Sequence, residues 1–196
     1  LKRYFKYDKD SLFEIGMKMF DGKKYKESIE FFQKAIKIDP YYEPAWHHLG
    51  SAYFLLRNWY IGMNALNKAI DINPFNHSNY YFRALILFSD SYLVDAFHDM
   101  QQALLLDNES PTYYSFTSRI CIQLGNDTQA IDYIHKAIEL KKVPKYYIER
   151  AEIIMVLFGT KMPFNYLLHE QMVKCKIRID INLLTSKKHF GKVFLS

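Results

Sequence analysis

The sequence predicts an all-α fold, an α-solenoid of stacked antiparallel helix hairpins, from three observations. First, residues 35–40 (AIKIDP) recur 34 positions later as residues 69–74 (AIDINP), and looser copies begin at Ala103 and Ala137. Second, apolar residues recur at helical spacing between these markers. Third, small residues occupy fixed columns where two helices have to approach closely. A period of this length is typical of an array in which no unit buries its apolar face alone.

The same period places each element along the chain. We expect units at residues 9–42, 43–76, 77–110 and 111–143, with a partial unit at 144–158. Turn-forming residues at 21–22, 57–58, 89–90 and 125–127 divide the units into two helices each. Prolines 40 and 74 stand at unit borders, where a missing backbone donor ends a helix. The small residues stand at positions 16, 35, 50, 69, 84, 103, 118, 130, 137 and 151.

These columns resemble those of the tetratricopeptide repeat family. The residues that carry the resemblance in the first two units are Leu12, Ile15, Gly16, Met19, Ser28, Phe32, Ala35 and Pro40, then Trp46, Leu49, Gly50, Tyr53, Gly62, Leu66, Ala69 and Pro74. Looser matches continue to residue 158. The resemblance implies an interaction scaffold whose first helices line a concave groove.

The two ends of the chain depart from the pattern. Residues 1–8 form a basic lead-in, and residues 159–196 are expected to form a C-terminal cap with a basic tail. Within the cap, residues 172–185 fit both an amphipathic helix and an alternating strand, so this choice stays open. Because the chain starts at Leu1 rather than Met, we expect it to be part of a longer protein.

Neither motifs nor cysteines indicate an enzyme. The sequence lacks the HExxH, CxxC, GxGxxG and GxxxxGK[ST] patterns, and its histidines have no companion ligands at chelating distance. We therefore expect no catalysis, no cofactor, no metal and no small-molecule substrate. Two cysteines, Cys121 and Cys175, make no disulfide framework, which favours a reducing compartment, the cytoplasm or the nucleus. The net charge of +5 comes from the ends, so nucleic-acid or membrane contact would be limited to them.

The resemblance also names the expected groove residues. They are Phe13, Met17 and Phe20 in the first unit, His47, His48, Ser51 and Phe54 in the second, Tyr81, Phe82, Leu85 and Phe88 in the third, and Phe116 and Arg119 in the fourth. Such aromatic content suits apolar anchors from a partner's helix or peptide. The alternative, that these rings pack internally, stays open.

The expected function is therefore a non-catalytic scaffold or adapter that binds another protein. The alternative is a regulatory or targeting domain of a larger multidomain enzyme. Some family members hold acidic C-termini of heat-shock proteins with a clamp of Lys, Asn and Arg. Here the corresponding columns contain Phe13, Met17, His48, Ser78 and Phe82, so that clamp is not expected.

Overall fold

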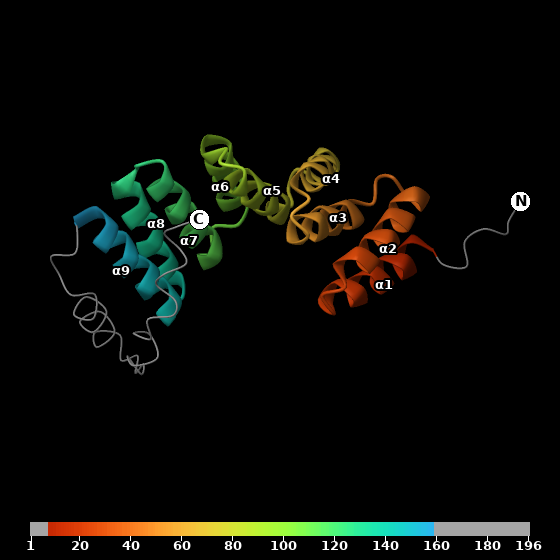
Figure 1. The fold of residues 1–196 in the computed structure, drawn as a ribbon, viewed down its shortest axis with the longest axis horizontal. Coiled ribbons are helices and arrows are strands. Elements are labelled where there is room, and N and C mark those ends of the chain that lie inside the picture. Colours follow the sequence, from red (N-terminus) through yellow and green to blue (C-terminus); the bar gives the residue numbers. More distant parts are fainter. Residues whose placement is uncertain (1–7, 159–196) are drawn as a thin grey trace, which may run out of the picture. The chain divides into compact units, whose positions relative to one another are not determined.

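The computed structural model describes residues 8–158, and this part of the chain is helical throughout, with short connections (Figure 1). The helices are α1 (Lys9–Asp21), α2 (Tyr25–Ile38), α3 (Glu43–Leu55), α4 (Trp59–Ile72), α5 (His77–Ser89), α6 (Leu93–Leu106), α7 (Pro111–Gln123), α8 (Asp127–Leu140) and α9 (Pro144–Phe158). The prediction of an all-α fold of stacked helix hairpins is confirmed. The predicted cap at 159–196, including residues 172–185, lies outside the described residues.

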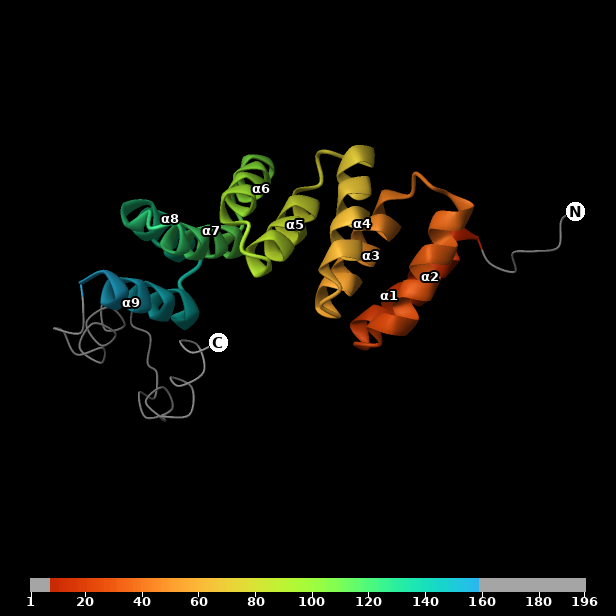
Figure 2. The same ribbon diagram turned by 45° about the horizontal axis from the view of Figure 1, so that its top comes forward.

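The chain divides into two compact units between Tyr113 and Tyr114. In the first unit, α1 pairs with α2, α3 with α4 and α5 with α6 (Figure 2). Successive hairpins are joined by packing of α2 on α3 and of α4 on α5. Each hairpin therefore buries its apolar face partly within itself and partly against the next.

In the second unit, α8 packs against both α7 and α9. The Ser118 hydroxyl of α7 donates a hydrogen bond of 2.6 Å to the Ala130 carbonyl of α8. A core cluster then joins α8 to α9; its buried members are Ile134, Ala137, Ile138, Tyr146, Tyr147 and Ile153.

Small residues make close helix packing possible. All ten positions at which the sequence predicts a small residue at a helix crossing are buried. At Gly16 an added Cβ would lie 2.6 Å from Cε1 of Phe32, and at Gly50 it would lie 2.6 Å from Cγ of Leu66. Contacts this short leave no room for a side chain.

The turn inside each hairpin follows one design. Lys23, Arg57, Ser91 and Gly125, spaced 34 residues apart, all have a positive φ of 59° to 74°. Each of these residues donates its backbone N–H to the carbonyl three residues earlier, and the next N–H reaches the carbonyl five residues before it. This is a Schellman motif, which satisfies the last carbonyls of the helix. In the first turn the left-handed residue is Lys23, whereas Gly22 has a φ of −74°.

Candidate functional site

Ring contacts join the first helices of the three hairpins in the first unit. From α1, the rings of Phe13 and Phe20 lie 5.4 and 5.6 Å from the His48 ring of α3. From α3, His47 and Phe54 lie 5.3 and 6.3 Å from the Phe82 ring of α5. The half-buried side chains on these helices form what we call the aromatic face: Phe13, Met17, Phe20, His48, Phe54, Tyr81, Phe82, Leu85 and Phe88.

The same contact recurs from one hairpin to the next. Phe20 meets His48 edge-on at an interplanar angle of 73°, and Phe54 meets Phe82 edge-on at 75°. In both pairs the partners are 28 residues apart, so His48 occupies the position that Phe82 has in the following hairpin. Edge-to-face pairs of this kind are favourable arrangements of aromatic rings.

His48 is held in this aromatic position as a neutral ring. Burial, assisted by the neighbouring His47, lowers the pKa of His48 to about 4. Its Nδ1 atom is buried and has no hydrogen-bond partner among the described residues. A polar atom enclosed in this way destabilises the fold, which marks His48 as an imperfect substitute for a phenyl ring.

Some of the expected groove residues lie in the interior instead. Ser51 and Phe116 are 1% and 4% exposed, and the Ser51 hydroxyl donates to the carbonyl of His47 within α3. The Nδ1 atom of His47, itself buried, donates to Oδ1 of Asn79 at 2.6 Å. Arg119 is exposed in the second unit, with its guanidinium carbon 5.9 Å from the Phe116 ring centre.

The chain of rings reaches one helix further than the sequence indicated. Tyr81 lies 4.9 Å from the ring of Tyr113, whose hydroxyl is 2.7 Å from Nδ1 of His77. Tyr81 and Tyr113 stand 34 residues after His47 and Asn79, so one pair of columns meets at both hairpin junctions. This periodicity of contacts was the signal that could have identified Tyr113.

A second feature of the first unit is a pocket of about 380 Å³ formed by α4, α5 and α6. Its floor is an ion pair in which Nε and Nη2 of Arg83 donate to the two carboxylate oxygens of Asp99, each at 2.7 Å. Nη1 of Arg83 also donates to Asn67 at 2.8 Å. The pair links the third hairpin to α4 of the second.

Two searches of the described part of the chain bear on other kinds of site. Residues 8–158 contain no group of three or more His, Cys, Asp or Glu side chains placed to hold a metal ion. Within the same range, no helix combines the length and apolar character that crossing a bilayer requires.

Comparison with known proteins identifies the repeat. A family model described as "Tetratricopeptide repeat" matches residues 11–42, 43–76 and 112–144, half of the chain. The chain belongs to the tetratricopeptide repeat family. The matched segments leave out α5 and α6, where the Arg83–Asp99 pair stands in the core columns of the repeat.

Individual tetratricopeptide repeat relatives are distant. Superkiller protein 3 of Saccharomyces cerevisiae is 24% identical over 144 residues, which cover 72% of this chain but only 10% of that protein. PilF of Pseudomonas aeruginosa has a TM-score of 0.73 at 15% identity, over 90% of this chain and 79% of PilF. The first repeat domain of Spaghetti (RPAP3), bound to the HSP90 peptide SRMEEVD, has a TM-score of 0.59 at 26% identity, over 60% of this chain and 94% of that domain. These structures share the helical repeat fold.

Proposed function

We propose that this protein is a non-catalytic adapter that binds a segment of a partner protein on the aromatic face of its first unit. The observation that carries this proposal is the continuous series of half-buried rings from Phe13 to Phe82 across three hairpins. Half-buried rings retain apolar surface that a partner can cover, and clustered apolar surface of this kind typically marks an interaction site.

The family supports the same function. Tetratricopeptide repeats generally serve protein interactions, and the RPAP3 domain is seen with a peptide bound. The ligand chemistry of that domain does not transfer to this chain. Its peptide, SRMEEVD, is rich in carboxylates, whereas Phe13, Met17 and Phe82 offer no charged donor for a carboxylate.

The test replaces two rings of the aromatic face. Phe54→Ser together with Phe82→Ser removes apolar surface from neighbouring hairpins, and the variant's helicity and melting temperature are measured first. Partners are then captured from cells with the tagged chain and quantified by mass spectrometry. We expect the specific partners of the unmodified chain to be lost.

A matched control replaces two rings that lie off the face. Tyr60 and Phe75 are 79% and 77% exposed, and Tyr60→Ser with Phe75→Ser changes as many rings without touching the aromatic face. This control should keep the partners. Equal recovery by a folded Phe54→Ser, Phe82→Ser chain would contradict the proposed function. Should that variant unfold, Phe88→Ser offers a milder change in the same column as Phe54.

A further inference from the structure

We infer that the segment bound on the aromatic face is an amphipathic α-helix with acidic residues along one flank. The inference rests on the proposed function and deepens it, because it specifies the conformation and the charge of the partner segment. Three independent features of the first unit carry it: the scarcity of free hydrogen-bonding groups, the spacing of a column of phenylalanines, and unpaired basic charge along one edge.

The face offers little to the backbone of an extended peptide. Of its members on α1, Phe13, Met17 and Phe20 have no hydrogen-bonding side-chain atoms, and the Nδ1 atom of His48 on α3 is enclosed. Beneath them, the Ser51 hydroxyl is already bonded within α3. An extended chain laid here would lose water from its N–H and C=O groups without replacement, which costs free energy for each group. A helix satisfies its backbone internally and loses nothing of this kind.

The spacing of the rings fits a helix as well. Phe20, Phe54 and Phe88 occupy one column, each two residues before the end of α1, α3 and α5. Packed helices lie about 8–10 Å apart, so neighbouring members of the column are separated by roughly one such step. Two turns of a helix advance about 10.5 Å, so side chains at i and i+7 reach successive phenylalanines. Side chains at i+3 or i+4 then meet the rings between them.

The Schellman turns place basic charge next to the same column. Lys23 and Arg57 donate their backbone N–H groups to the carbonyls of Phe20 and Phe54, at 2.9 Å each. With Lys24 they form what we call the turn edge; all three side chains are exposed, and none forms an ion pair within residues 8–158. Asp21 offsets one of these charges, and the third turn carries Asp90 instead.

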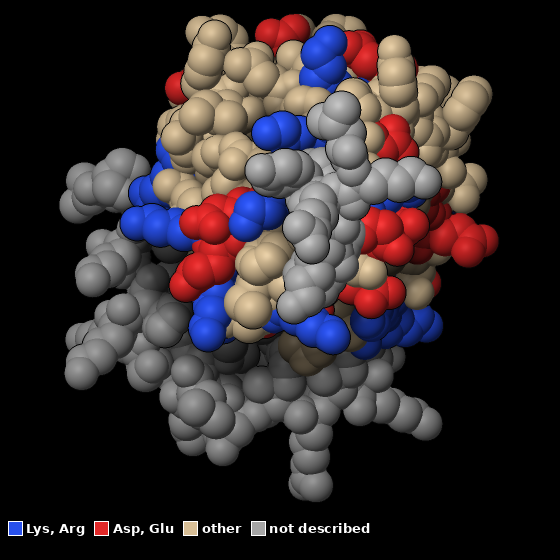
Figure 3. Space-filling view, turned by 90° about the vertical axis from the view of Figure 1, so that its right-hand side faces the viewer, with Lys and Arg blue, Asp and Glu red and all other residues tan. Residues whose placement is uncertain are grey.

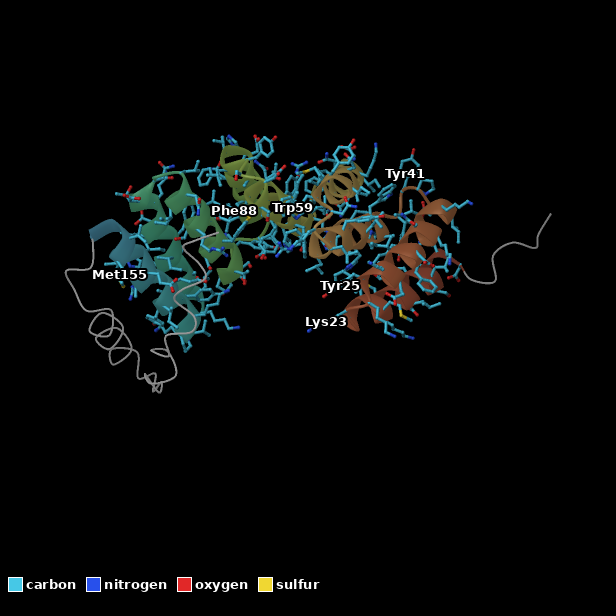
Figure 4. All side chains as sticks on the ribbon, in the orientation of Figure 1. Lys23, Tyr25, Tyr41, Trp59, Phe88 and Met155 are labelled. Atoms are coloured by element: carbon cyan, nitrogen blue, oxygen red, sulfur yellow. The ribbon has the colours of Figure 1, made fainter. Side chains whose placement is uncertain are left out.

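The figures locate this edge. In Figure 4, Lys23 and Tyr25 lie at one end of the first hairpin and Tyr41 at the other. Figure 3 shows Lys and Arg side chains along the lower margin of the described surface, the side on which the α1–α2 turn lies. At the opposite end, Lys9 is paired with Asp10 and Asp39. The unpaired charge beside the column is therefore positive, and acidic residues on the helix flank over the first two hairpins complement it.

The inference is tested by selection from a random peptide library. An mRNA-display library of 20-residue random peptides is selected on the full chain and counter-selected on the Phe54→Ser, Phe88→Ser variant. We expect the enriched peptides to carry apolar residues at i, i+3 or i+4, and i+7, with acidic residues on one flank, and to gain helical circular dichroism when bound. Lys23→Glu with Arg57→Glu should weaken the best peptide at least fivefold in low salt, and less in high salt.

The outcomes separate the inference from the proposed function. Enriched peptides that need Phe54 and Phe88 but show alternating apolar residues, or bind without helical signal, would overturn the helical partner and leave the aromatic face as the site. A helix whose affinity is unaffected by the charge reversal would overturn the acidic flank. Binders that ignore both phenylalanines, or no enrichment at all, would overturn the proposed function and the inference with it.

A measurement on the unmodified chain guards against a variant that fails to fold. With methionine methyl groups labelled for NMR, a selected peptide should shift the Met17 signal, since Met17 lies on the aromatic face. Met63, which lines the pocket between α4 and α6, serves as the internal control and should not move. A shift at Met63 without one at Met17 would place the peptide elsewhere.

Discussion

Arg83 and Asp99 form a two-pronged ion pair at the two core positions that Leu49 and Ala65 occupy in the preceding hairpin. Leu49 and Ala65 are 5% and 2% exposed, and the Asp99 side chain is 8% exposed. The third hairpin thus packs a charged pair where the second packs apolar side chains. Replacing only one partner leaves a buried charge without compensation.

The first prediction follows from this exchange. Arg83→Leu alone, or Asp99→Ala alone, should each lower the free energy of unfolding by about 3 kcal/mol, because the remaining partner is left unpaired. The double replacement recreates the Leu49–Ala65 arrangement and should cost less than about 1 kcal/mol. Urea denaturation of the four chains gives the coupling energy. Additive effects in the double variant would show that the pair is not energetically linked.

The second prediction concerns the crossing of α3 and α4. A Cβ at residue 50 would lie 2.6 Å from Leu66 Cγ and 3.1 Å from the Gly62 carbonyl oxygen. The clash outweighs the gain in helix propensity, so Gly50→Ala should destabilise the chain by about 1–2 kcal/mol. Thermal melting checks this in two backgrounds. In a Leu66→Ala chain, where the space is free, the same change should cost nothing, and a full cost there would contradict the steric explanation.

The third prediction concerns backbone strain in the turns. Arg57 has a φ of 60°, a conformation that glycine adopts without steric cost. Arg57→Gly should therefore stabilise the fold by about 1 kcal/mol, and Gly125→Ala should destabilise it by a similar amount. Asn58, with a φ of −94°, is the matched control, and Asn58→Gly should not stabilise. Because Arg57 also belongs to the turn edge, the stabilised variant should bind the selected acidic helix less tightly.

The fourth prediction concerns pH. The folded-state pKa of His48, about 4, is below its ordinary value of 6.5, so the unfolded chain binds more protons between these two pH values. Stability from this group is fully present above pH 6.5 and is lost as the pH falls towards 4, by up to about 1.4 kcal/mol per pH unit. Burial also lowers the pKa of His47, which adds loss in the same direction.

His48→Phe isolates the contribution of this ring. The variant places a phenyl group where the next hairpin has Phe82, and it removes the unpaired Nδ1 atom. We expect it to be more stable than the unmodified chain at pH 7 by about 1 kcal/mol, with a shallower loss between pH 6.5 and 4. Urea denaturation at several pH values measures both. An unchanged pH slope would assign the effect to His47 or to groups elsewhere.

How far the sequence anticipates this structure depends on the kind of interaction. Gly16 and Ala35 could be assigned to helix crossings because close packing is a local, repeated demand that admits few residue types. The left-handed residue of the first turn could not be assigned in this way. Glycine at 22 is the natural candidate, yet the hydrogen bonds from Lys23 and Lys24 close the motif one residue later.

Pairwise polar interactions are the least predictable part. Arg83 reads as a solvent-facing residue, and only the fold shows Asp99 within reach of both prongs of its guanidinium group. His47 likewise reads as a groove residue, but Asn79 captures its Nδ1 from the next hairpin. In each case the partner is 16 or 32 residues away, so its identity depends on helix geometry that a column pattern does not encode.

The diagonal ring contacts set a rule for how this chain can change length. Phe20 reaches His48, and Phe54 reaches Phe82, across the same interval of 28 residues. Excising residues 43–76 would deliver Phe20 to Phe82 in the place that Phe54 now holds, with every later interval intact. Losing a single residue from the loop between α2 and α3 would put the two rings out of phase. The protein can therefore shorten or lengthen by whole hairpins far more readily than by single amino acids.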